Sequence, residues 1–362
     1  MWASGFAHSP LIQATPEEYY ALLLFGSGAW PFCSAYKWPH ATARFYGWPP
    51  WVYLWRASPD FCSCFLFLPM STATVTMPPA ALHRLRDETL DLDSLAAYNL
   101  YLTAGPAGLR VGVADVRRNK FVALDEYTAP EAGVSVAQQA LALAADHDLL
   151  GRTGWNRVRL AVQNRAFTLL PAPLFRAGDE AACLQLHHAL DPQRESVHHY
   201  THPGLDITSL FAVDTGLSSW FRNAYPAGRL VHQTSALLQG VAHQSEQGSP
   251  RRIYLSIGQQ EVTLLAMNGK QPEFCNVFPF STPEDLIYYT ILVMQELQLN
   301  PDQDMVMVWG DLMHDSELFT ILRKYIRNLR FGNRPFDLSY SYRLNDLFEY
   351  RYFELYALHL CE

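Results

Sequence analysis

Apolar and polar residues follow the same order in two stretches of this chain, and the pattern predicts a unit that is used twice. Each stretch holds three short apolar runs separated by turn residues, which is typical of strands joined by hairpins. A proline and a glutamate then open a run with helical spacing. The strands are predicted at 98–103, 109–114 and 120–126 in the first stretch, and at 253–257, 262–267 and 274–278 in the second.

The two stretches also correspond residue by residue, without a gap. The run YLTAG that ends at Gly105 corresponds to the run YLSIG that ends at Gly258, and the Pro-Glu pair at 130–131 corresponds to the pair at 283–284. Glycine and proline mark turns and helix starts, so their agreement in register indicates a duplicated β-β-β-α unit.

Further elements extend each unit. A strand is predicted at 158–162 after the first helix, and another at 305–309 after the second. Residues 191–250 have no counterpart in the repeat and are predicted to form an inserted subdomain. Thr282 is predicted to cap the second helix, with Asp285 three residues later. The other predicted elements are helices at 130–147, 180–188, 215–224, 233–243 and 316–329, and strands at 167–170, 196–200, 207–213 and 229–232.

Residues 1–69 differ from the rest of the chain. They hold six of the nine tryptophans and three of the six cysteines, and only six of them are charged. This segment is either a genuine extension or upstream sequence translated from a start codon placed too early, with Met70 or Met77 as the true start; we favour the second interpretation. The predicted domains are therefore this N-terminal extension, a first lobe at 78–190 that opens with a polar lead-in, the inserted subdomain at 191–250, and a second lobe at 251–362.

Composition narrows the class of protein. With 362 residues, 49% of them apolar and 17% charged, the chain is expected to be globular with a sizeable core. Its net charge of −8 argues against a nucleic-acid surface. No run of eighteen apolar residues is present, so no membrane span is expected. Six cysteines without regular paired spacing are typical of a reducing compartment, so we expect a cytoplasmic protein.

Three strands, a helix and a further strand, present twice with an insertion between them, resemble the plan of the actin-like ATPase fold. The chain is also similar to an uncharacterised bacterial family, domain of unknown function 3822 (DUF3822), over roughly residues 85–360. The resemblance implies an α/β fold of two duplicated actin-like (ribonuclease H-like) lobes and no particular activity. The residues that carry it are Phe167-Thr168-Leu169-Leu170-Pro171, Leu174-Phe175, Asn276-x-Phe278, Glu284-Asp285, Tyr288-Tyr289, Gly310 and Lys324-Tyr325-Ile326.

The resemblance also indicates where a nucleotide would bind. Actin-like ATPases hold Mg-ATP between the lobes, at Asp-x-Gly turns in which glycine admits the phosphates and aspartate serves the hydrated cation. This chain has Thr103 and Gly105 in the first turn, and Ser256 and Gly258 in the second. Both glycines are kept and both aspartates are missing.

Two further positions depart from the pattern of these ATPases. Gln259 follows the second turn where a small residue is usual, and the strand at 305–309 is followed by a single glycine, Gly310, and then by Asp311. Without a carboxylate in the turns, Mg²⁺ has no obvious protein ligand. We therefore predict degenerate phosphate loops, with no metal and no cofactor. The alternative is ATP binding, with metal ligands at unusual positions such as Asp311 or Asp115.

Three other motifs contain the residue types of catalytic, metal or anion sites. Asp214-Thr215-Gly216 follows an apolar strand, as the catalytic aspartate of an aspartic protease does, but such an enzyme needs two carboxylates that share a proton. Capping of the 215–224 helix by Asp214 is therefore the preferred interpretation. A cluster of histidines lacks the cysteine or carboxylate that would complete a zinc-type spacing, and comprises His187, His188, His198, His199 and His202. Four basic residues are predicted to form a solvated face of the 316–329 helix: Arg323, Lys324, Arg327 and Arg330.

We therefore predict a non-catalytic actin-like protein that acts by binding a protein partner and has a degenerate nucleotide cleft. The alternatives are an ATP-binding actin-like ATPase or kinase-type enzyme with atypical metal ligands and, further removed, an aspartic protease that uses Asp214. The predicted fold also places Gly105 and Gly258 at equivalent hairpin turns that face a common cleft.

Overall fold

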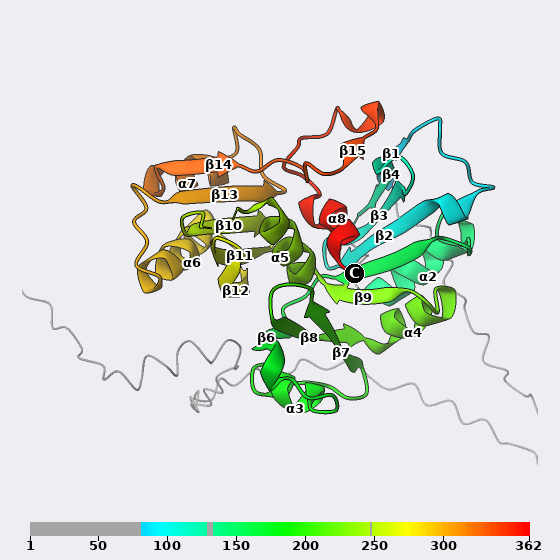
Figure 1. The fold of residues 1–362 in the computed structure, drawn as a ribbon, viewed down its shortest axis with the longest axis horizontal. Helices are drawn as coiled ribbons and strands as arrows, with labels where there is room; N and C mark the ends of the chain where they lie inside the picture. The colour runs from blue at the N-terminus through cyan, green and yellow to red at the C-terminus, as the bar shows by residue number, and fades with distance from the viewer. Residues whose placement is uncertain (1–80, 129–132, 247) are drawn as a thin grey trace, which may run out of the picture. The chain divides into compact units, whose positions relative to one another are not determined.

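The structure is a computed structural model that describes residues 81–128, 133–246 and 248–362. The predictions about residues 1–69 and about the starts Met70 and Met77 lie outside these residues. The described residues form three sheets with helices packed against them, which is a mixed α/β architecture (Figure 1). In this part of the chain, every helix is too short or too polar to span a bilayer.

The first sheet is built around β2 (Tyr98–Gly105). Its strand order is β1-β4-β3-β2-β5-β9, and β15 also pairs with β4. β2 is antiparallel to β3 and parallel to β5, which is in turn parallel to β9. The remaining bounds are β1 (Ala81–Arg86), β3 (Gly108–Asp115), β4 (Lys120–Tyr127), β5 (Arg157–Val162), β9 (Arg229–His232) and β15 (Ser339–Tyr340).

The second sheet has the same arrangement around β10 (Arg252–Ile257). Its order is β12-β11-β10-β13-β14, with β10 antiparallel to β11 and parallel to β13, and with β13 parallel to β14. The six strands predicted for the two hairpin units are all present. The remaining bounds are β11 (Glu261–Asn268), β12 (Gln271–Pro279), β13 (Met305–Gly310) and β14 (Asn328–Phe331).

The start of α6 (Pro283–Glu296) confirms the predicted cap. Thr282 accepts a hydrogen bond from the Asp285 N–H at 3.2 Å, and the Asp285 carboxylate accepts one from the Thr282 N–H at 2.9 Å. This reciprocal pair satisfies backbone donors that have no partner inside the helix. The face of α6 that packs on the second sheet comprises Leu286, Ile287, Thr290, Val293 and Met294.

The helix of the first unit, α2 (Val136–Asp146), begins later than predicted. Ser135 accepts from the Gln138 N–H, and the Gln138 side chain accepts from the Ser135 N–H, so a capping box fixes the start there. The predicted first residues, Pro130 and Glu131, lie outside the described residues. Spacing alone could not choose between these two starts.

Two stretches adopt a different secondary structure from the one predicted. The helix predicted at 316–329 ends early, as α7 (Glu317–Tyr325), and the residues that follow form β14 along β13. Arg327 and Arg330 therefore do not share a helix face with Arg323. The lead-in at 78–97 contains β1, which pairs with β4 at the edge of the first sheet.

The sheets do not divide at residues 191 and 250, where the sequence predicted the boundaries of an insertion. The third sheet has the order β6-β8-β7, and its first strand, β6 (Phe167–Pro171), precedes residue 191. Its other strands are β7 (Glu195–His202) and β8 (Ile207–Asp214). The later part of the predicted insertion is not separate, because β9 pairs with β5 in the first sheet.

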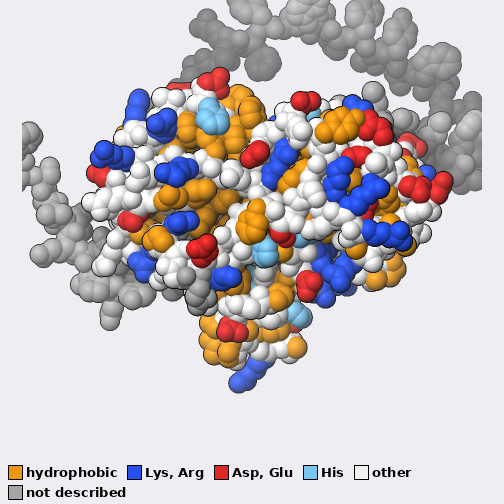
Figure 2. Space-filling model, turned by 45° about the horizontal axis from the view of Figure 1, so that its top comes forward, with side chains coloured by type: hydrophobic (Ala, Val, Ile, Leu, Met, Phe, Trp, Pro, Cys, Tyr) orange, Lys and Arg blue, Asp and Glu red, His pale blue; other side chains and the backbone are white. Residues whose placement is uncertain are grey.

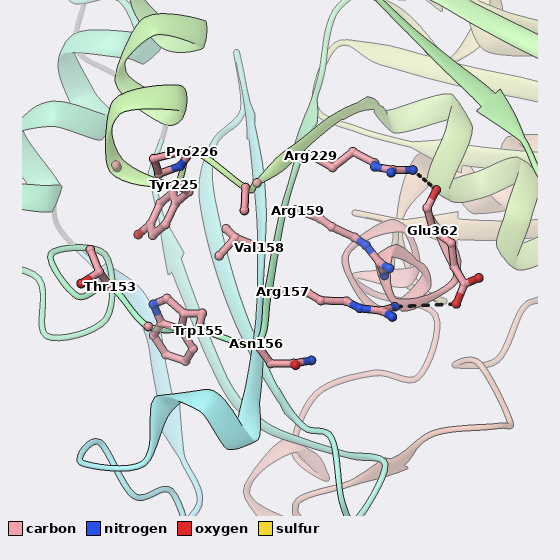
Figure 3. Close-up of a pocket in the computed structure, with 14 residues that line it drawn as sticks. Thr153, Trp155, Asn156, Arg157, Val158, Arg159, Tyr225, Pro226, Arg229 and Glu362 are labelled. Carbon is pink, nitrogen blue, oxygen red and sulfur yellow. Dashed lines mark hydrogen bonds and ion pairs between the residues drawn. The ribbon is translucent and has the colours of Figure 1, made fainter.

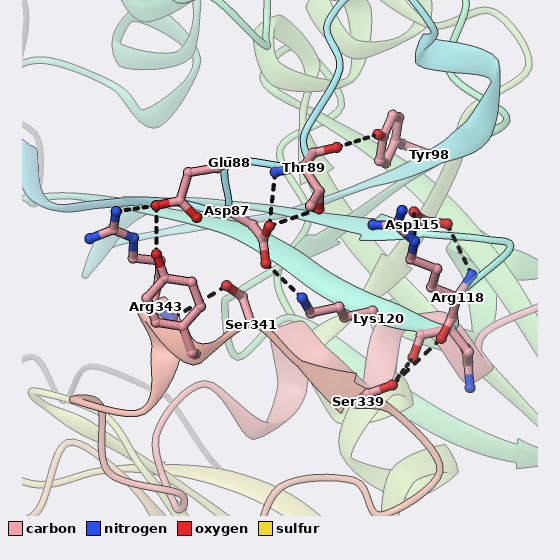
Figure 4. Close-up of polar contacts among 12 residues, drawn as sticks. Asp87, Glu88, Thr89, Tyr98, Asp115, Arg118, Lys120, Ser339, Ser341 and Arg343 are labelled. Carbon is pink, nitrogen blue, oxygen red and sulfur yellow. Dashed lines mark hydrogen bonds and ion pairs between the residues drawn. The ribbon is translucent and has the colours of Figure 1, made fainter.

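The last residues, predicted as part of the second lobe, return to the first sheet. β15 pairs with β4, and α8 (Phe353–Ala357) packs on β2, β3 and α5 (Gln233–Gln244). The two helices approach closely at Gly240, where a Cβ would lie 2.8 Å from the ring of Phe353. Near β15, Arg343 pairs with Glu88, and Lys120 lies 2.7 Å from Asp87 (Figure 4).

Candidate functional site

The turn after β2 keeps its glycine for reasons of packing. Gly105 pairs with Gly108 across a two-residue turn, and a Cβ on Gly105 would lie 2.4 Å from the Cβ of Gln163. Thr103, two residues earlier, is buried within the sheet. Gln163 therefore packs directly against the glycine of the first turn.

The corresponding end of the second sheet also depends on glycine. The Gly258 N–H donates to the Glu261 carbonyl at 2.8 Å and closes the turn, and Gln259 is exposed to solvent. Gly310 has φ +108°, and a Cβ there would lie 2.0 Å from the carbonyl oxygen of Ile257. Only glycine allows β13 to end so close to β10.

Arg110 joins the ends of the two sheets. It lies directly opposite Thr103 in the β2–β3 hairpin, and its guanidinium is 2.8 Å from Glu126 and 3.2 Å from Asp311. Asp311 follows Gly310 at the end of β13, in the second sheet. The sheet ends that carry Gly105 and Gly258 therefore face each other through this ion pair.

Asp311 is bound on both of its carboxylate oxygens. Oδ2 faces Arg110, and Oδ1 accepts a hydrogen bond from Arg351 at 2.9 Å. Burial alone would lower the pKa of Arg110, but Asp311 and Glu126 raise it above its ordinary value. The two arginines and the two carboxylates thus balance one another in a partly buried network.

Two further contacts complete this network, which we call the interlobe network. The Tyr352 hydroxyl donates to Glu126 at 2.7 Å, and the Ser256 hydroxyl donates to Glu354. Burial raises the pKa of Glu354, and the hydrogen bond from Ser256 opposes that rise only in part. Ser256 is the second-turn residue that stands where an aspartate is usual. Its hydroxyl is therefore already engaged by Glu354 of the same chain.

The other suggested metal ligand, Asp115, lies at the opposite end of the first sheet. It pairs with Tyr98 at the start of β2, whereas Gly105 pairs with Gly108. The part of β3 from Arg110 to Asp115, roughly 17 Å at about 3.3 Å per residue, separates it from the interlobe network. Its carboxylate accepts the N–H groups of Arg117 and Arg118 and holds the β3–β4 turn (Figure 4).

Asp214 caps α4 (Thr215–Ala224), as preferred from the sequence. Its exposed carboxylate accepts the Leu217 N–H at 3.0 Å. The histidines predicted as a cluster are engaged separately. His202 is buried, 2.7 Å from Ser209, whereas His198 accepts from Arg222 at 3.3 Å through Nδ1.

The structure brings together another group, Asp125, His147 and Asp148, that spacing along the sequence did not suggest. His147 Nδ1 accepts the Leu149 N–H at 3.0 Å, so the ring proton lies on Nε2, which is 3.1 Å from Asp125. Arg86 also pairs with Asp125 and with Asp148. A guanidinium therefore already fills the position that a cation would take between these carboxylates.

Arg110 and Arg351 were missed in the sequence analysis. Arg351 lies 40 residues along the chain from Asp311, and Arg110 lies 201 residues from it, so no local spacing links them. A signal for Arg110 was nevertheless available, because the predicted β2–β3 hairpin places it beside Thr103 at the candidate cleft.

Comparison with known proteins supports the fold and leaves the activity open. A family model described as "Protein of unknown function (DUF3822)" matches residues 87–329. None of the curated proteins matches the chain. A solved structure from Bacteroides thetaiotaomicron, described as a protein with actin-like ATPase fold and unknown function, is 19% identical with a TM-score of 0.66, and the match covers 75% of this chain and 99% of that one.

A second solved structure, described as the PilM-PilN type IV pilus biogenesis complex, is also similar. The identity is 17% and the TM-score 0.50, and the match covers 73% of this chain and 98% of that one. At such low identity these likenesses show the fold alone, which is that of the actin-like ATPases. Since the family model matches most of its length, this chain belongs to the DUF3822 family of proteins of unknown function.

Proposed function

We propose that this protein is a non-catalytic member of the actin-like fold that acts by binding a protein partner. In this proposal the two five-strand arrangements around β2 and β10 are duplicated lobes, and β6, β7 and β8 are the insertion. The common strand order and strand directions of the two sheets support the duplication.

The observation that carries the proposal is the state of Asp311. It follows Gly310 at the end of β13, and each of its oxygens faces an arginine. Mg²⁺ requires oxygen ligands in a near-octahedral arrangement. A cation at Asp311 would have to break both ion pairs and would then lie beside two guanidinium groups.

The hydroxyl groups in the turns offer little in place of Asp311. Thr103 is buried, and the Ser256 hydroxyl donates a hydrogen bond to Glu354. A neutral hydroxyl holds a hydrated divalent cation weakly compared with a carboxylate. The donors for a triphosphate are thus present, in Arg110 and Arg351, without a site for its cation.

The choice of a protein partner follows from the fold likeness to a protein solved in a complex. The PilM-PilN structure is described as an assembly, and its chain is matched over 98% of its length. An actin-like protein that has no working nucleotide site can still act by binding other proteins through its surface. We therefore expect the function of this chain to depend on binding and not on turnover.

One observation favours the alternative, an ATP-binding ATPase. Arg110 and Arg351 are the kind of donors that bind phosphate, and a triphosphate that displaced Asp311 from them would free that carboxylate for a cation. The two hypotheses differ in what Mg-ATP does to the protein. The alternative requires turnover that depends on Asp311.

The test is phosphate release from Mg-ATP by the purified full chain, together with its melting temperature with and without Mg-ATP. We expect no sustained release and no rise in melting temperature, because a ligand that does not bind the native state cannot stabilise it. Asp311→Asn is compared with the exposed control Asp302→Asn. Release that is lost in the first variant and kept in the second would contradict the proposal and establish the ATPase.

A further inference from the structure

An open cavity of about 520 Å³ lies where β5 and β9 begin, away from the interlobe network. One wall is formed by Trp155 and Tyr225, whose polar atoms are engaged within the protein, with Arg152 and Leu150 respectively. Both residues are buried, 9% and 5% exposed respectively, so they close the cavity and offer little surface to a ligand. Its volume is in the range of ordinary ligand sites.

A row of arginines lines the other side of this cavity. Arg157 and Arg159 alternate with Val158 on β5, so they point to the same face of the sheet, and Arg229 on β9 pairs with Arg159 in register. Figure 3 shows the three side chains extending in one direction, with Trp155 and Tyr225 on the opposite side of β5. Glu362 is the only acidic residue in the lining.

The charge of this row contrasts with that of the whole protein. The chain carries a net charge of −8, and on the face drawn in Figure 2 acidic and basic side chains are interspersed. A second hollow, of about 310 Å³, shares residues 226–229 with the first and is also lined by Arg222. A further arginine thus lies across the loop that joins α4 to β9.

The arginine row already holds a peptide segment, namely residues 358–362 of the same chain. Arg159 donates to the carbonyl oxygens of Leu358 and His359 at 2.6 and 2.8 Å. Arg229 donates to the main-chain oxygen of Glu362, and Arg157 lies 3.7 Å from the Glu362 side-chain carboxylate (Figure 3). Both the main chain and the side chain of an acidic residue are therefore recognised.

The hold on Glu362 is weak. Its side chain is 72% exposed and that of Arg157 is 57% exposed, so water and salt screen their attraction. Arg159, in contrast, is buried and fixed by its two carbonyl partners. An acidic residue from another chain could thus replace Glu362 at Arg157 and Arg229 without disturbing Arg159.

We propose that this cavity binds an acidic segment of a protein partner, with a glutamate or aspartate at Arg157 and Arg229. This rests on the proposed function, and it names the surface that would bind the partner. A peptide suits the site better than a nucleic acid, because the present occupant is bound through a side-chain carboxylate and a main-chain oxygen. The acidic net charge also opposes a long polyanion.

The test uses fluorescence anisotropy with the full chain and a short fluorescein-labelled peptide of glutamate and leucine. We expect saturable binding that weakens with salt, and loss of about tenfold or more in affinity in the double variant Arg157→Gln, Arg229→Gln, because two charge-assisted contacts are removed. The control is Arg176→Gln, an exposed arginine outside the cavity, which should bind like the wild type.

A second variant separates a site from general charge attraction. Glu362→Gln removes the side-chain carboxylate that competes at Arg157 but keeps the main-chain contact with Arg229. It should tighten peptide binding about threefold, whereas the exposed control Glu296→Gln should not. Three results would overturn the proposal: no binding of the peptide, equal loss with Arg176→Gln, or equal affinity for single-stranded DNA. The phosphate-release assay is independent of these results, so failure of this site and failure of the proposed function are distinguishable.

Discussion

Two pairs of arginines in this protein face carboxylates under opposite conditions. Arg110 and Arg351 lie in the interlobe network, where the side chain of Arg110 is 15% exposed and that of Glu126 is 6% exposed. Arg157 and Arg229 line the cavity at the start of β5 and β9, beside the exposed Glu362. The same chemistry therefore appears once inside the protein and once at its surface.

The difference in exposure indicates which ion pairs stabilise the fold. A buried ion pair is costly to form, but removal of one partner leaves an uncompensated charge that the interior cannot solvate. An exposed pair is screened, so its partners are free to exchange. We therefore assign the interlobe network to structure and the exposed row to binding. Each prediction below tests that assignment, beginning with the largest effect.

Arg110→Met should cause the largest loss of stability. The variant keeps the aliphatic part of the side chain but leaves Glu126 and Asp311 short of a partner, so we expect a loss of about 3–5 kcal/mol in the free energy of unfolding. Chemical denaturation measures it. Arg118→Met, at a 57% exposed arginine, is the control and should lose less than about 1 kcal/mol. Equal small losses in both variants would show that the interlobe network does not hold the sheets together.

A double variant tests whether Arg110 and Glu126 stabilise the fold as a pair. Arg110→Met combined with Glu126→Leu removes a guanidinium and a carboxylate together, and should recover part of the stability lost in the single variant. A double variant that loses the sum of both single losses would mean that the two side chains act independently.

Acid should destabilise the protein through the buried His202, whose own contribution is of intermediate size. Burial lowers the pKa of His202 from 6.5 to about 4. Below pH 6.5 the unfolded chain takes up a proton that the folded chain refuses, so stability is full above that pH and falls as the pH drops toward 4. For His202 alone the expected loss is about 3 kcal/mol. His232 and His198 add to it in the same direction, since burial lowers the pKa of both, to about 3 and about 4.

Denaturation at several pH values measures this decline. His202→Gln can retain hydrogen bonding to Ser209 and cannot titrate, so its stability should fall less steeply between pH 6.5 and 4. His187→Gln, at an exposed histidine, should leave the slope unchanged. Identical slopes in wild type and His202→Gln would show that the folded protein protonates His202 as readily as the unfolded chain does.

Sequence reasoning succeeded in this chain where the determining contacts are local. The cap of α6 lies within four residues, at Thr282 and Asp285, and the six hairpin strands are each joined by a short turn. It failed where the partner is distant. The residues after Tyr325 continue a helical spacing, yet they become β14 because Asn328 pairs with Met305 on β13.

The candidate site divides in the same way. The glycines at 105 and 258 were found because they recur in the repeat, and Gly310 was found because it follows a predicted strand where actin-like ATPases have glycine. Arg110 and Arg351, which determine the chemistry of the site, were not found. The sequence does not indicate which distant carboxylate a given arginine will contact. The same holds for Asp125 and His147, which meet only after α2 packs on the first sheet.

The smallest effect is expected at the exposed row. Arg157→Gln breaks a contact of 3.7 Å between two side chains that are both more than half exposed, so the free energy of unfolding should change by less than about 1 kcal/mol. The same variant should weaken binding of the acidic peptide, because a bound carboxylate loses one of its two cationic partners. Stability is measured by denaturation and binding by anisotropy on the same preparation, with Arg176→Gln as the control for both. A loss of stability as large as that of Arg110→Met would erase the distinction between the two pairs of arginines, since the exposed row would then belong to the fold and would not be free to bind.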